Sequence, residues 1–411
     1  MARLSPLRAL RPRPELAPQL SSVPYDVVSA DEARRIAEGN PHSFLRVTRS
    51  EIELAPEADP HADAVYERAR ANLDRLRASG ALVREREPSL YVYRLRMGEH
   101  EQTGVAGGFS VDEYERDLIR RHETTRRDKE DDRTRHILTV RAQTGIVFLT
   151  YAARPEIDRV VARVTAAPPL YDFVAADGVT HRLWLAPPAQ RDALIAGFAA
   201  VPAIYIADGH HRIASAWRAR GEIRAGRGLR PQHPEAGDCE RFLAVAFPDD
   251  QVRILPYHRL VVDLAGRTPV AFASELAARF RAVDDAPQPT RPGRVSVYLA
   301  GVWRTFELPL PADAASPISK LDCERLQREL LAPLLGIGDP RSDQRIDFVG
   351  GIRGTAELER RVDAGRAAVA FALYPVSVAD LVAVSDAHEM MPPKSTWFEP
   401  KLRDGLLVHE I

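Results

Sequence analysis

The sequence has little cysteine, little lysine and no long apolar run, and each shortage excludes a class of protein. Cys239 and Cys323 are the two cysteines among 411 residues, too few for a disulfide framework or a cysteine-based zinc site. The apolar runs fall short of the ~18 residues that a membrane-spanning helix needs. Residues 1–18 are basic and proline-rich and lack the apolar stretch of a signal peptide. We therefore expect a cytoplasmic protein without a membrane partner.

An excess of one charge is also missing, because 57 basic and 58 acidic residues give a net charge of -1. Nucleic-acid binding usually needs a basic face, and the charged runs here mix both signs, as solvated helix faces do. We predict no nucleic-acid partner. Lysine is rare within the basic set, which contains only Lys129, Lys320, Lys394 and Lys401. In such an arginine-rich chain, each lysine is a candidate for a role that needs a compact ammonium group.

The length exceeds that of one average domain, and the pattern of elements changes near residue 265. Before that point, we expect residues 1–22 to be irregular and the regular elements to be longer than those that follow it. After it, helices and strands alternate, which favours a mixed α/β layer. We expect the closing segment 390–411 to be extended. We therefore predict an α/β protein with domains at 1–265 and 266–411.

The expected elements follow from capping boxes, apolar periodicity and turn residues. Helices are predicted at 29–39, at 62–79 and from Ser110 into the charged stretch 120–136, followed by 269–281, 322–335, 356–363 and 378–386. Strands are predicted at 90–95, 146–151, 181–186, 205–207 and 242–247, then at 294–300, 303–308, 346–351 and 368–374.

Residues 201–217, VPAIYIADGHHRIASAW, contain the most informative motif. An apolar strand is followed by Asp208-Gly209-His210-His211-Arg212 and then by a helical pattern. Gly209 would allow a positive φ, and the first helical N–H groups attract an anion. Arg212 could contact phosphate oxygens in a bidentate way, and Asp208 could bind a magnesium ion carried by that phosphate. The motif therefore predicts a phosphate site. A structural role, with Asp208 as a helix cap, is the alternative.

A zinc site is a second alternative for the same turn, because Asp208, His210 and His211 are all competent ligands. Adjacent residues at a helix start point in different directions, whereas helical metal pairs are spaced i, i+4. Arg212 would also repel a cation. The sequence favours phosphate over zinc.

Three further segments carry candidate chemistry. His122 and Glu123 lie where the apolar periodicity of the charged stretch stops, and Glu123 could act as a general base. Lys394, Ser395 and Thr396 follow a proline pair and could form an anion-binding corner, although the glycine-rich lead of a P-loop is missing. The segment Asp347–Gly351 before a predicted helix is a weaker candidate phosphate turn. For the charged stretch that contains His122 and Glu123, the alternative is a solvated helix face. For Asp347–Gly351, the alternative is an ordinary glycine pair between a strand and a helix.

Together, the segments PYDVVSADEA, NPHSFLRV, HETTRRDKEDDR, YIADGHHRIASA and MPPKSTWFEPKLRDGL resemble the bacterial and archaeal family known as domain of unknown function 1015. They occur in the family's order and extend from Pro24 to Leu406. The DGHHR and PPKST motifs are the most specific of them. This family name by itself states no activity.

The DGHHR motif also resembles that of the free-serine kinases of the ParB and sulfiredoxin superfamily, which phosphorylate L-serine with ADP or ATP. The resemblance implies a ParB/sulfiredoxin-like core with insertions, residues 1–265, that binds the nucleotide, and a smaller C-terminal α/β domain, 266–411, that closes over the substrate. It implies Glu123 as the base, with Asp208 and His211 also catalytic. Residues 208–212 would bind the phosphates with magnesium on Asp208, and His122, Lys394, Ser395 and Thr396 would bind the substrate.

The resulting hypothesis is a small-molecule kinase that transfers a phosphoryl group from ATP or ADP, with Mg²⁺, to free serine or a similar hydroxy amino acid. A homodimer is a possible assembly. One alternative is a ParB-like nucleotide switch that binds CTP without phosphorylating an acceptor. The other is a metal-dependent phosphatase or hydrolase that uses the histidines.

Overall fold

A computed structural model describes residues 2–227, 234–311 and 316–411, which form two compact units. Unit 1 comprises Met1–Arg120, Thr125–Val252 and Pro400–Ile411, and unit 2 comprises Arg121–Thr124 and Arg253–Glu399. The division therefore differs from the expected boundary at 265. The chain enters unit 2 in β13 (Arg253–Leu255) and leaves it in β20 (Trp397–Glu399), and these strands pair with each other. The amino-acid composition does not change at β13 or β20, so nothing in the sequence indicates that these two strands pair.

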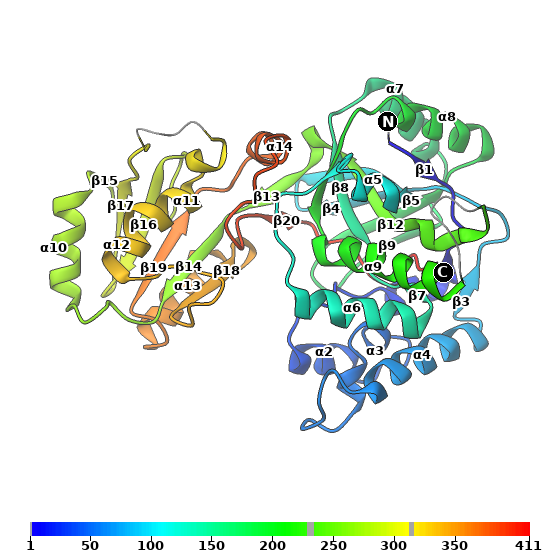
Figure 1. Ribbon diagram of the computed structural model, residues 1–411, viewed down its shortest axis with the longest axis horizontal. Coiled ribbons are helices and arrows are strands. Elements are labelled where there is room, and N and C mark those ends of the chain that lie inside the picture. Colours follow the sequence, from blue (N-terminus) through cyan, green and yellow to red (C-terminus); the bar gives the residue numbers. More distant parts are fainter. Residues whose placement is uncertain (1, 228–233, 312–315) are drawn as a thin grey trace. The chain divides into compact units, whose positions relative to one another are not determined.

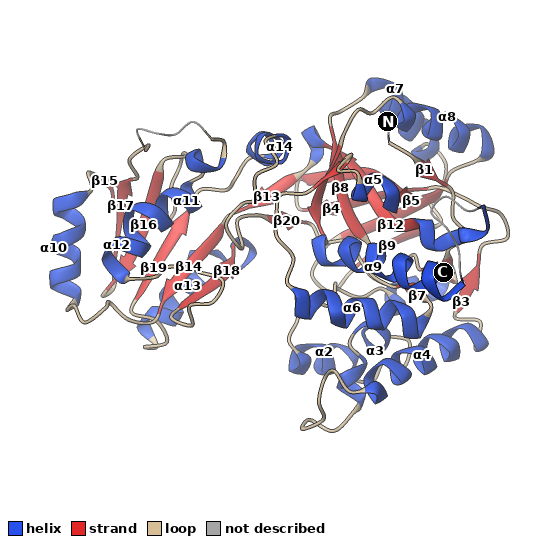
Figure 2. Cartoon of the chain, viewed as in Figure 1, coloured by secondary structure: helices blue, strands red, loops and turns tan. Residues whose placement is uncertain are grey.

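Unit 1 contains a sheet of nine strands among the described residues, in the order β6-β11-β8-β12-β5-β4-β10-β9, with β1 added on β5. The strands are drawn as red arrows in Figure 2. Most neighbours are antiparallel, but β11 runs parallel to β6, and β8 parallel to β12. Strand β8, which lies between β11 and β12, is buried along its whole length, as its continuous apolar run predicts. The strands are β1 (Leu4–Ser5), β4 (Tyr91–Met97), β5 (His100–Ser110), β6 (Ile119–Arg120), β8 (Val147–Tyr151), β9 (Tyr171–Val174), β10 (Thr180–Leu185), β11 (Ile204–Asp208) and β12 (Arg241–Pro248).

Helices pack on this sheet in layers. One of them, α9, packs on β8; α6 lies beside α9, and α4 packs on α6 (Figure 1). Side chains from α7 and α8 join those of the sheet in one apolar core that includes Phe109, Leu149, Phe198 and Phe242. The helices of unit 1 are α1 (Ala17–Leu20), α2 (Ala30–Ala37), α3 (Leu45–Thr48), α4 (Asp63–Ala78), α5 (Val111–Glu115), α6 (Arg127–Val140), α7 (Pro155–Thr165), α8 (Pro188–Ala199) and α9 (His210–Arg227).

The C-terminal segment of unit 1 pairs with segments that are distant in the sequence. Ser22 and Asp404 exchange two backbone hydrogen bonds, and Leu10 bridges to Val408. Two small sheets complete the unit: β21 (His409–Glu410) pairs with β7 (Ala142–Gln143), and β2 (Leu10–Pro12) pairs with β3 (Leu82–Arg84). The last residues of the chain are thus built into unit 1.

Unit 2 is organised around an antiparallel sheet of six strands among the described residues, in the order β15-β17-β16-β19-β14-β18. Its core includes Leu260, Val349, Leu358 and Ala370. The sheet strands are β14 (Tyr257–Val261), β15 (Ala282–Asp284), β16 (Arg294–Leu299), β17 (Val302–Glu307), β18 (Ile346–Gly350) and β19 (Val369–Leu373). The helices are α10 (Pro269–Arg279), α11 (Asp322–Leu326), a π turn (Gln327–Leu331), α12 (Ala332–Leu335), α13 (Gly354–Asp363) and α14 (Val378–Asp386).

The mixed α/β class predicted from the sequence is confirmed, and most of the predicted elements occur. The continuous helix from Ser110 into residues 120–136 is wrong: α5 ends at Glu115, Asp117 adopts a φ of 58° and β6 follows. Ile119 pairs with Ile204 of β11, so sheet formation decides the structure there. Residues 1–22, expected to be irregular, contain β1, β2 and α1. Within the described ranges, no helix combines the length and apolarity that a membrane crossing requires.

Candidate functional site

The turn between β11 and α9 in unit 1 has the predicted strand–glycine–helix form. Strand β11 ends at Asp208, and Gly209 follows with a φ of 96°, which a side chain would strain. The backbone N–H groups of Arg212 and Ile213 both donate to the Gly209 carbonyl, at 2.9 and 3.2 Å. The first turn of α9 therefore begins at this carboxylate, and the positive end of the helix dipole lies beside it.

Asp208 forms an ion pair with a lysine that the motif does not contain. Lys401 Nζ lies 2.8 Å from Asp208 Oδ2, and both side chains belong to unit 1. Burial by itself would raise the pKa of Asp208, but Lys401 and Arg212 hold it well below its ordinary range. The carboxylate is therefore ionised at neutral pH and keeps 29% of its side-chain surface exposed. The turn presents a carboxylate and an ammonium group together.

Arg212 is buried and its guanidinium is held within unit 1. Its Nη2 donates to both oxygens of Asp26, at 2.8 and 2.9 Å, and its Nη1 donates to the Ile146 carbonyl at 2.8 Å. These bonds fix the start of α9 to the loop that contains Tyr25 and Asp26. A contact between Arg212 and phosphate stays a prediction, and in this structure the two Nη groups hold the turn in place.

A cavity of about 30 Å³ lies beside the guanidinium, lined by residues that include Tyr25, Arg133, Thr144 and Arg212. Arg212 Nε is buried there without a hydrogen-bond partner. A cavity of ~10–15 Å³ already accommodates a water molecule, so this one is large enough for a water that accepts a hydrogen bond from Nε.

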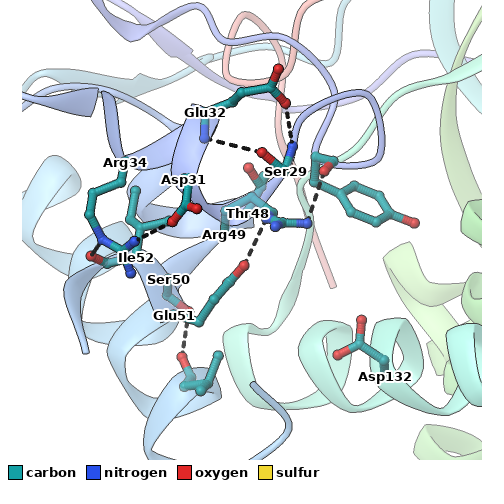
Figure 3. A network of polar contacts seen from close by, with 12 residues as sticks. Ser29, Asp31, Glu32, Arg34, Thr48, Arg49, Ser50, Glu51, Ile52 and Asp132 are labelled. Atoms are coloured by element: carbon teal, nitrogen blue, oxygen red, sulfur yellow. Dashed lines mark hydrogen bonds and ion pairs between the residues drawn. The ribbon is translucent and has the colours of Figure 1, made fainter. Parts of the chain in front are cut away.

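The loop containing Tyr25 is braced by neighbouring helices. Arg49 donates to the Tyr25 carbonyl at 3.3 Å and pairs with Glu51 at 2.7 Å (Figure 3). The guanidinium of Arg133 stacks 4.4 Å from the centre of the Tyr25 ring. Just beyond the loop, Ser29 and Glu32 form the predicted capping box of α2 (Figure 3). This bracing holds Asp26 in place for its bonds with Arg212.

Asp404 is a third carboxyl group of this region. It is buried, and its Oδ1 accepts a 3.4 Å hydrogen bond from the Ile146 N–H. Its Oδ2 is buried without a hydrogen-bond partner. Burial, with Asp26 acting in the same direction and Arg212 against it, raises the pKa of Asp404 to about 7. This carboxyl group therefore changes its protonation near neutral pH.

The two histidines of the motif have different surroundings. His210 is buried. The Nε2 atom of His211 accepts a 3.0 Å hydrogen bond from the backbone N–H of Arg126, which precedes α6. In the neutral ring, Nδ1 then carries the proton. His211 thus links the starts of α6 and α9, and a catalytic role for it stays a prediction.

The predicted substrate residues belong to unit 2. His122 Nε2 lies 3.3 Å from Thr396 Oγ1, and the His122 carbonyl accepts a hydrogen bond from the Met391 N–H at 2.8 Å. Ser395 is buried and donates to the Pro392 carbonyl at 2.7 Å, whereas Lys394 is exposed. Glu123 lies in the same segment as His122 and is half-buried. The structure brings His122 and Thr396 together, and the roles of all these residues stay predictions.

The glycine pair after Asp347 has a packing role. A Cβ atom at Gly350 would lie 2.5 Å from the Trp397 ring, and one at Gly351 would lie 2.6 Å from the Pro256 carbonyl oxygen. Both positions need glycine because these neighbours approach closely. The packing therefore accounts for the pair and favours the structural alternative over a phosphate turn.

Within the described ranges, no group of three or more His, Cys, Asp or Glu side chains could hold a metal ion. Asp208 alone fits a different arrangement, because magnesium is commonly held by one or two carboxylates together with the phosphates of a substrate. Its ionised state and partial exposure suit that role.

Sequence reasoning gave no role to Asp26, Asp404 and Lys401 in unit 1. It also gave none to Arg259 of unit 2, which donates to the Lys394 carbonyl at 2.9 Å. The scarcity of lysine did draw attention to Lys401. The PYD and KLRDG segments were noticed as parts of a resemblance, without a role for either aspartate. Nothing in the sequence around Arg259 distinguishes it from the many other arginines.

Residues 4–324 match the protein family described as "Protein of unknown function (DUF1015)". The chain belongs to this family. The match confirms the resemblance inferred from the motifs, although Lys394, Lys401 and Asp404 lie beyond the matched residues. A comparison with the curated proteins gives no match.

Several solved structures show weak similarity to the chain. SbnI with C-terminal truncation from Staphylococcus aureus shares 11% identity at a TM-score of 0.38, over 74% of this chain and 86% of that one. A free serine kinase in complex with AMP shares 11% identity at a TM-score of 0.35, over 72% and 86%. A conserved hypothetical protein from Pyrococcus furiosus shares 12% identity at 0.35, over 74% and 95%.

Proposed function

We propose that the protein is a nucleotide-dependent phosphotransferase that phosphorylates the hydroxyl group of a small hydroxy amino acid such as serine. The observation that carries the proposal is the ion pair of Asp208 and Lys401 at the N-terminus of α9. Phosphoryl transfer mainly requires positioning and the neutralisation of phosphate charge. A helix N-terminus, a lysine and an ionised carboxylate at one turn meet these requirements.

The donor nucleotide is assigned to unit 1. Lys401 is the cation that can turn from Asp208 toward the transferred phosphate, because its ammonium group rotates on a flexible stem. Arg212 keeps the start of α9 fixed through Asp26. The backbone N–H groups of the first helical turn add further donors to the phosphate oxygens. The proposal includes a ParB/sulfiredoxin-like core for this unit, which the DGHHR motif suggests.

Magnesium is assigned to Asp208. A bound Mg²⁺ ion would neutralise charge on the phosphate oxygens during transfer. The ionised state of Asp208, its partial exposure and its position at the helix start support this assignment. Lys401 beside the carboxylate would disfavour a lone cation, so the ion is expected to bind together with a nucleotide.

The acceptor is assigned to unit 2. Glu123 would take the proton from the acceptor hydroxyl group while the hydroxyl oxygen forms a bond to the terminal phosphorus of the donor. The bond from that phosphorus to the leaving oxygen breaks, releasing ADP from ATP or AMP from ADP. His122, Lys394, Ser395 and Thr396 would bind the acceptor. The contact between His122 and Thr396 supports the assignment of these residues to one group.

The test is direct assay of the full-length protein. ATP or ADP with magnesium is incubated with a panel of L-serine, L-threonine and L-homoserine, and the products are followed by phosphorus NMR. A new phosphomonoester that is absent with Asp208→Asn and with Glu123→Gln supports the proposal. Glu123→Gln should still bind nucleotide, because Glu123 is assigned to the acceptor.

Other outcomes of the assay would identify a different function. Tight binding of CTP without acceptor phosphorylation would indicate a nucleotide switch. Release of free phosphate without an acceptor would indicate a hydrolase. A cytoplasmic location and a homodimer stay predictions.

A further inference from the structure

The segment Met391–Thr396 of unit 2 is held in place by contacts with three other residues of the same unit. The Met391 N–H donates to the His122 carbonyl at 2.8 Å. Ser395 Oγ lies 3.2 Å from the Cys323 thiol of α11. Arg259 of β14 donates to the carbonyl oxygens of Lys394, at 2.9 Å, and Pro393, at 3.4 Å. This bracing fixes the backbone of Lys394, whose φ is 56° and whose side chain is exposed.

Arg259 has an unusual environment for a buried charge. Its residue surface is 3% exposed, and all of its hydrogen bonds go to main-chain carbonyl groups. Among the described residues, no carboxylate forms an ion pair with it. Burial lowers the pKa of Arg259, while Cys323 and Tyr257 act in the opposite direction. The positive charge is thus desolvated by the fold without a counter-charge from it.

The other buried arginines of the described residues differ from Arg259 in this respect. Each of them forms an ion pair with a carboxylate: Arg212 with Asp26, Arg220 with Glu115, Arg325 with Asp322 and Arg403 with Asp177. A buried charge is costly unless it is paired. Arg259 is the single exception among the described residues, and it contacts the backbone of the segment that contains Lys394.

We propose that Arg259 is a positioning residue of an anion-binding site at Lys394–Thr396, and that the anion is the carboxylate group of the acceptor amino acid. The inference rests on the proposed function, which assigns the acceptor to unit 2. Arg259 holds the carbonyl groups beneath Lys394 and adds positive potential at the segment. The ammonium of Lys394, which lies 5.7 Å from the centre of the Tyr257 ring, and the hydroxyl of Thr396 are the groups that contact the carboxylate. An acceptor without this carboxylate would not neutralise the positive charges of Arg259 and Lys394.

The experiment is a calorimetric titration of the full-length protein, with and without AMP. The probes are L-serine, L-threonine and L-homoserine, the three matching carboxamides, and inorganic phosphate. At least one amino acid should bind about 10-fold or more tightly than its carboxamide, because a charge-assisted hydrogen bond contributes about 1.5–3 kcal/mol. Arg259→Gln should abolish this preference, and Arg259→Lys should retain part of it, since a lysine keeps the charge but not all three carbonyl contacts.

Arg325→Gln is the matched control. Arg325 is also buried in unit 2 and also donates to a main-chain carbonyl, that of Pro309, but it pairs with Asp322. Its loss should leave the preference for the carboxylate intact. If Arg259→Gln does not fold, Arg259→Lys alone tests the positioning role, and Lys394→Gln tests the contact with the carboxylate.

Several results would overturn the inference. These are equal binding of acid and amide, an unchanged preference in Arg259→Gln, binding of none of the amino acids, or binding of phosphate alone. The proposed function is judged separately by the phosphorus NMR assay. A carboxylate preference without phosphoryl transfer would keep the anion site and contradict the kinase. Transfer to an acceptor that has no carboxylate would contradict the anion site alone.

Discussion

Lys401 Nζ lies 2.8 Å from Asp208 Oδ2, so a residue of the C-terminal segment completes the turn formed by β11 and α9. The two residues are 193 positions apart in the sequence. Asp404, three residues after Lys401, anchors the same segment by exchanging backbone hydrogen bonds with Ser22. The candidate nucleotide site of unit 1 therefore depends on the end of the chain.

Lys401→Gln tests this dependence. Loss of the ammonium group should weaken nucleotide binding by about 10- to 100-fold, because charged hydrogen bonds contribute about 1.5–3 kcal/mol. The free energy of unfolding should fall by about 1–3 kcal/mol, since Asp208 loses its partner. Calorimetric titration with ADP and urea denaturation measure the two effects. Lys129→Gln, on the exposed surface of α6, is the matched control and should change neither. Unchanged nucleotide affinity in Lys401→Gln would remove Lys401 from the site.

Substitution of two glycines tests the backbone conformation of the turn. Gly209 directly precedes α9, and Gly221 lies within it. Gly209 has a φ of 96°, and an added Cβ would meet Arg212 Cδ at 3.3 Å. Gly209→Ala should therefore lower the free energy of unfolding by about 1–2 kcal/mol and weaken nucleotide binding. Gly221 lies inside the helix, with open space where a Cβ would stand. Gly221→Ala should stabilise the protein by about 0.5–1 kcal/mol. The two thermal unfolding curves should shift in opposite directions, and shifts of the same sign would contradict this description of the turn.

Asp26→Asn tests whether Arg212 holds the turn through its carboxylate partner. The substitution removes the charge that faces a buried guanidinium, so we expect a loss of about 2–3 kcal/mol in the free energy of unfolding. Asp31→Asn provides the comparison, because Asp31 pairs with Arg34 on the surface with 88% of its side chain exposed. Such pairs contribute little. Equal effects of the two substitutions in urea denaturation would show that the Asp26–Arg212 pair is not a structural anchor.

Asp404 predicts a specific dependence of stability on pH. Its folded-state pKa of about 7 lies above the ordinary value of 3.8, so the folded protein binds this proton more tightly than the unfolded chain. Its contribution to stability is therefore complete at low pH and is lost as the pH rises from about 4 to about 7. Asp404→Asn cannot titrate and should become more stable relative to the unmodified protein across this interval. The gain can reach about 4 kcal/mol, from about three pKa units.

The measurement is the difference between the unfolding free energies of the two proteins at several pH values. The difference is needed because other groups titrate in the opposite sense. Burial lowers the pKa of His136 and of His258 to about 4, so their contribution is lost as the pH falls from about 6.5. A difference that is constant between pH 4 and pH 8 would contradict a raised pKa for Asp404.

The sequence predicted the local part of the site because strand, glycine and helix follow one another in one short segment. The glycine at position 209 and the apolar run before it were sufficient to place Asp208 at the end of a strand. The error at Ser110–Arg120 has a different origin. Leu118 and Ile119 suit a helix face or a strand equally well, and the pairing of Ile119 with Ile204 decides between them.

The remaining residues of the site could not be derived from local patterns. Asp26 and Asp404 reach the region of Arg212 from opposite ends of the chain. Arg259 differs from other buried arginines only in what surrounds it. Which charged side chains contact each other depends on the three-dimensional fold and not on their spacing along the sequence. The membership of His122 and Glu123 in unit 2 depends on the same kind of distant contact.

Phosphorus NMR of the full-length protein with magnesium, ATP or ADP and L-serine, L-threonine or L-homoserine tests the central claim most directly. The proposed function predicts a new phosphomonoester signal with at least one acceptor, and its loss in Asp208→Asn. The absence of a phosphomonoester with every donor and acceptor of the panel would contradict it.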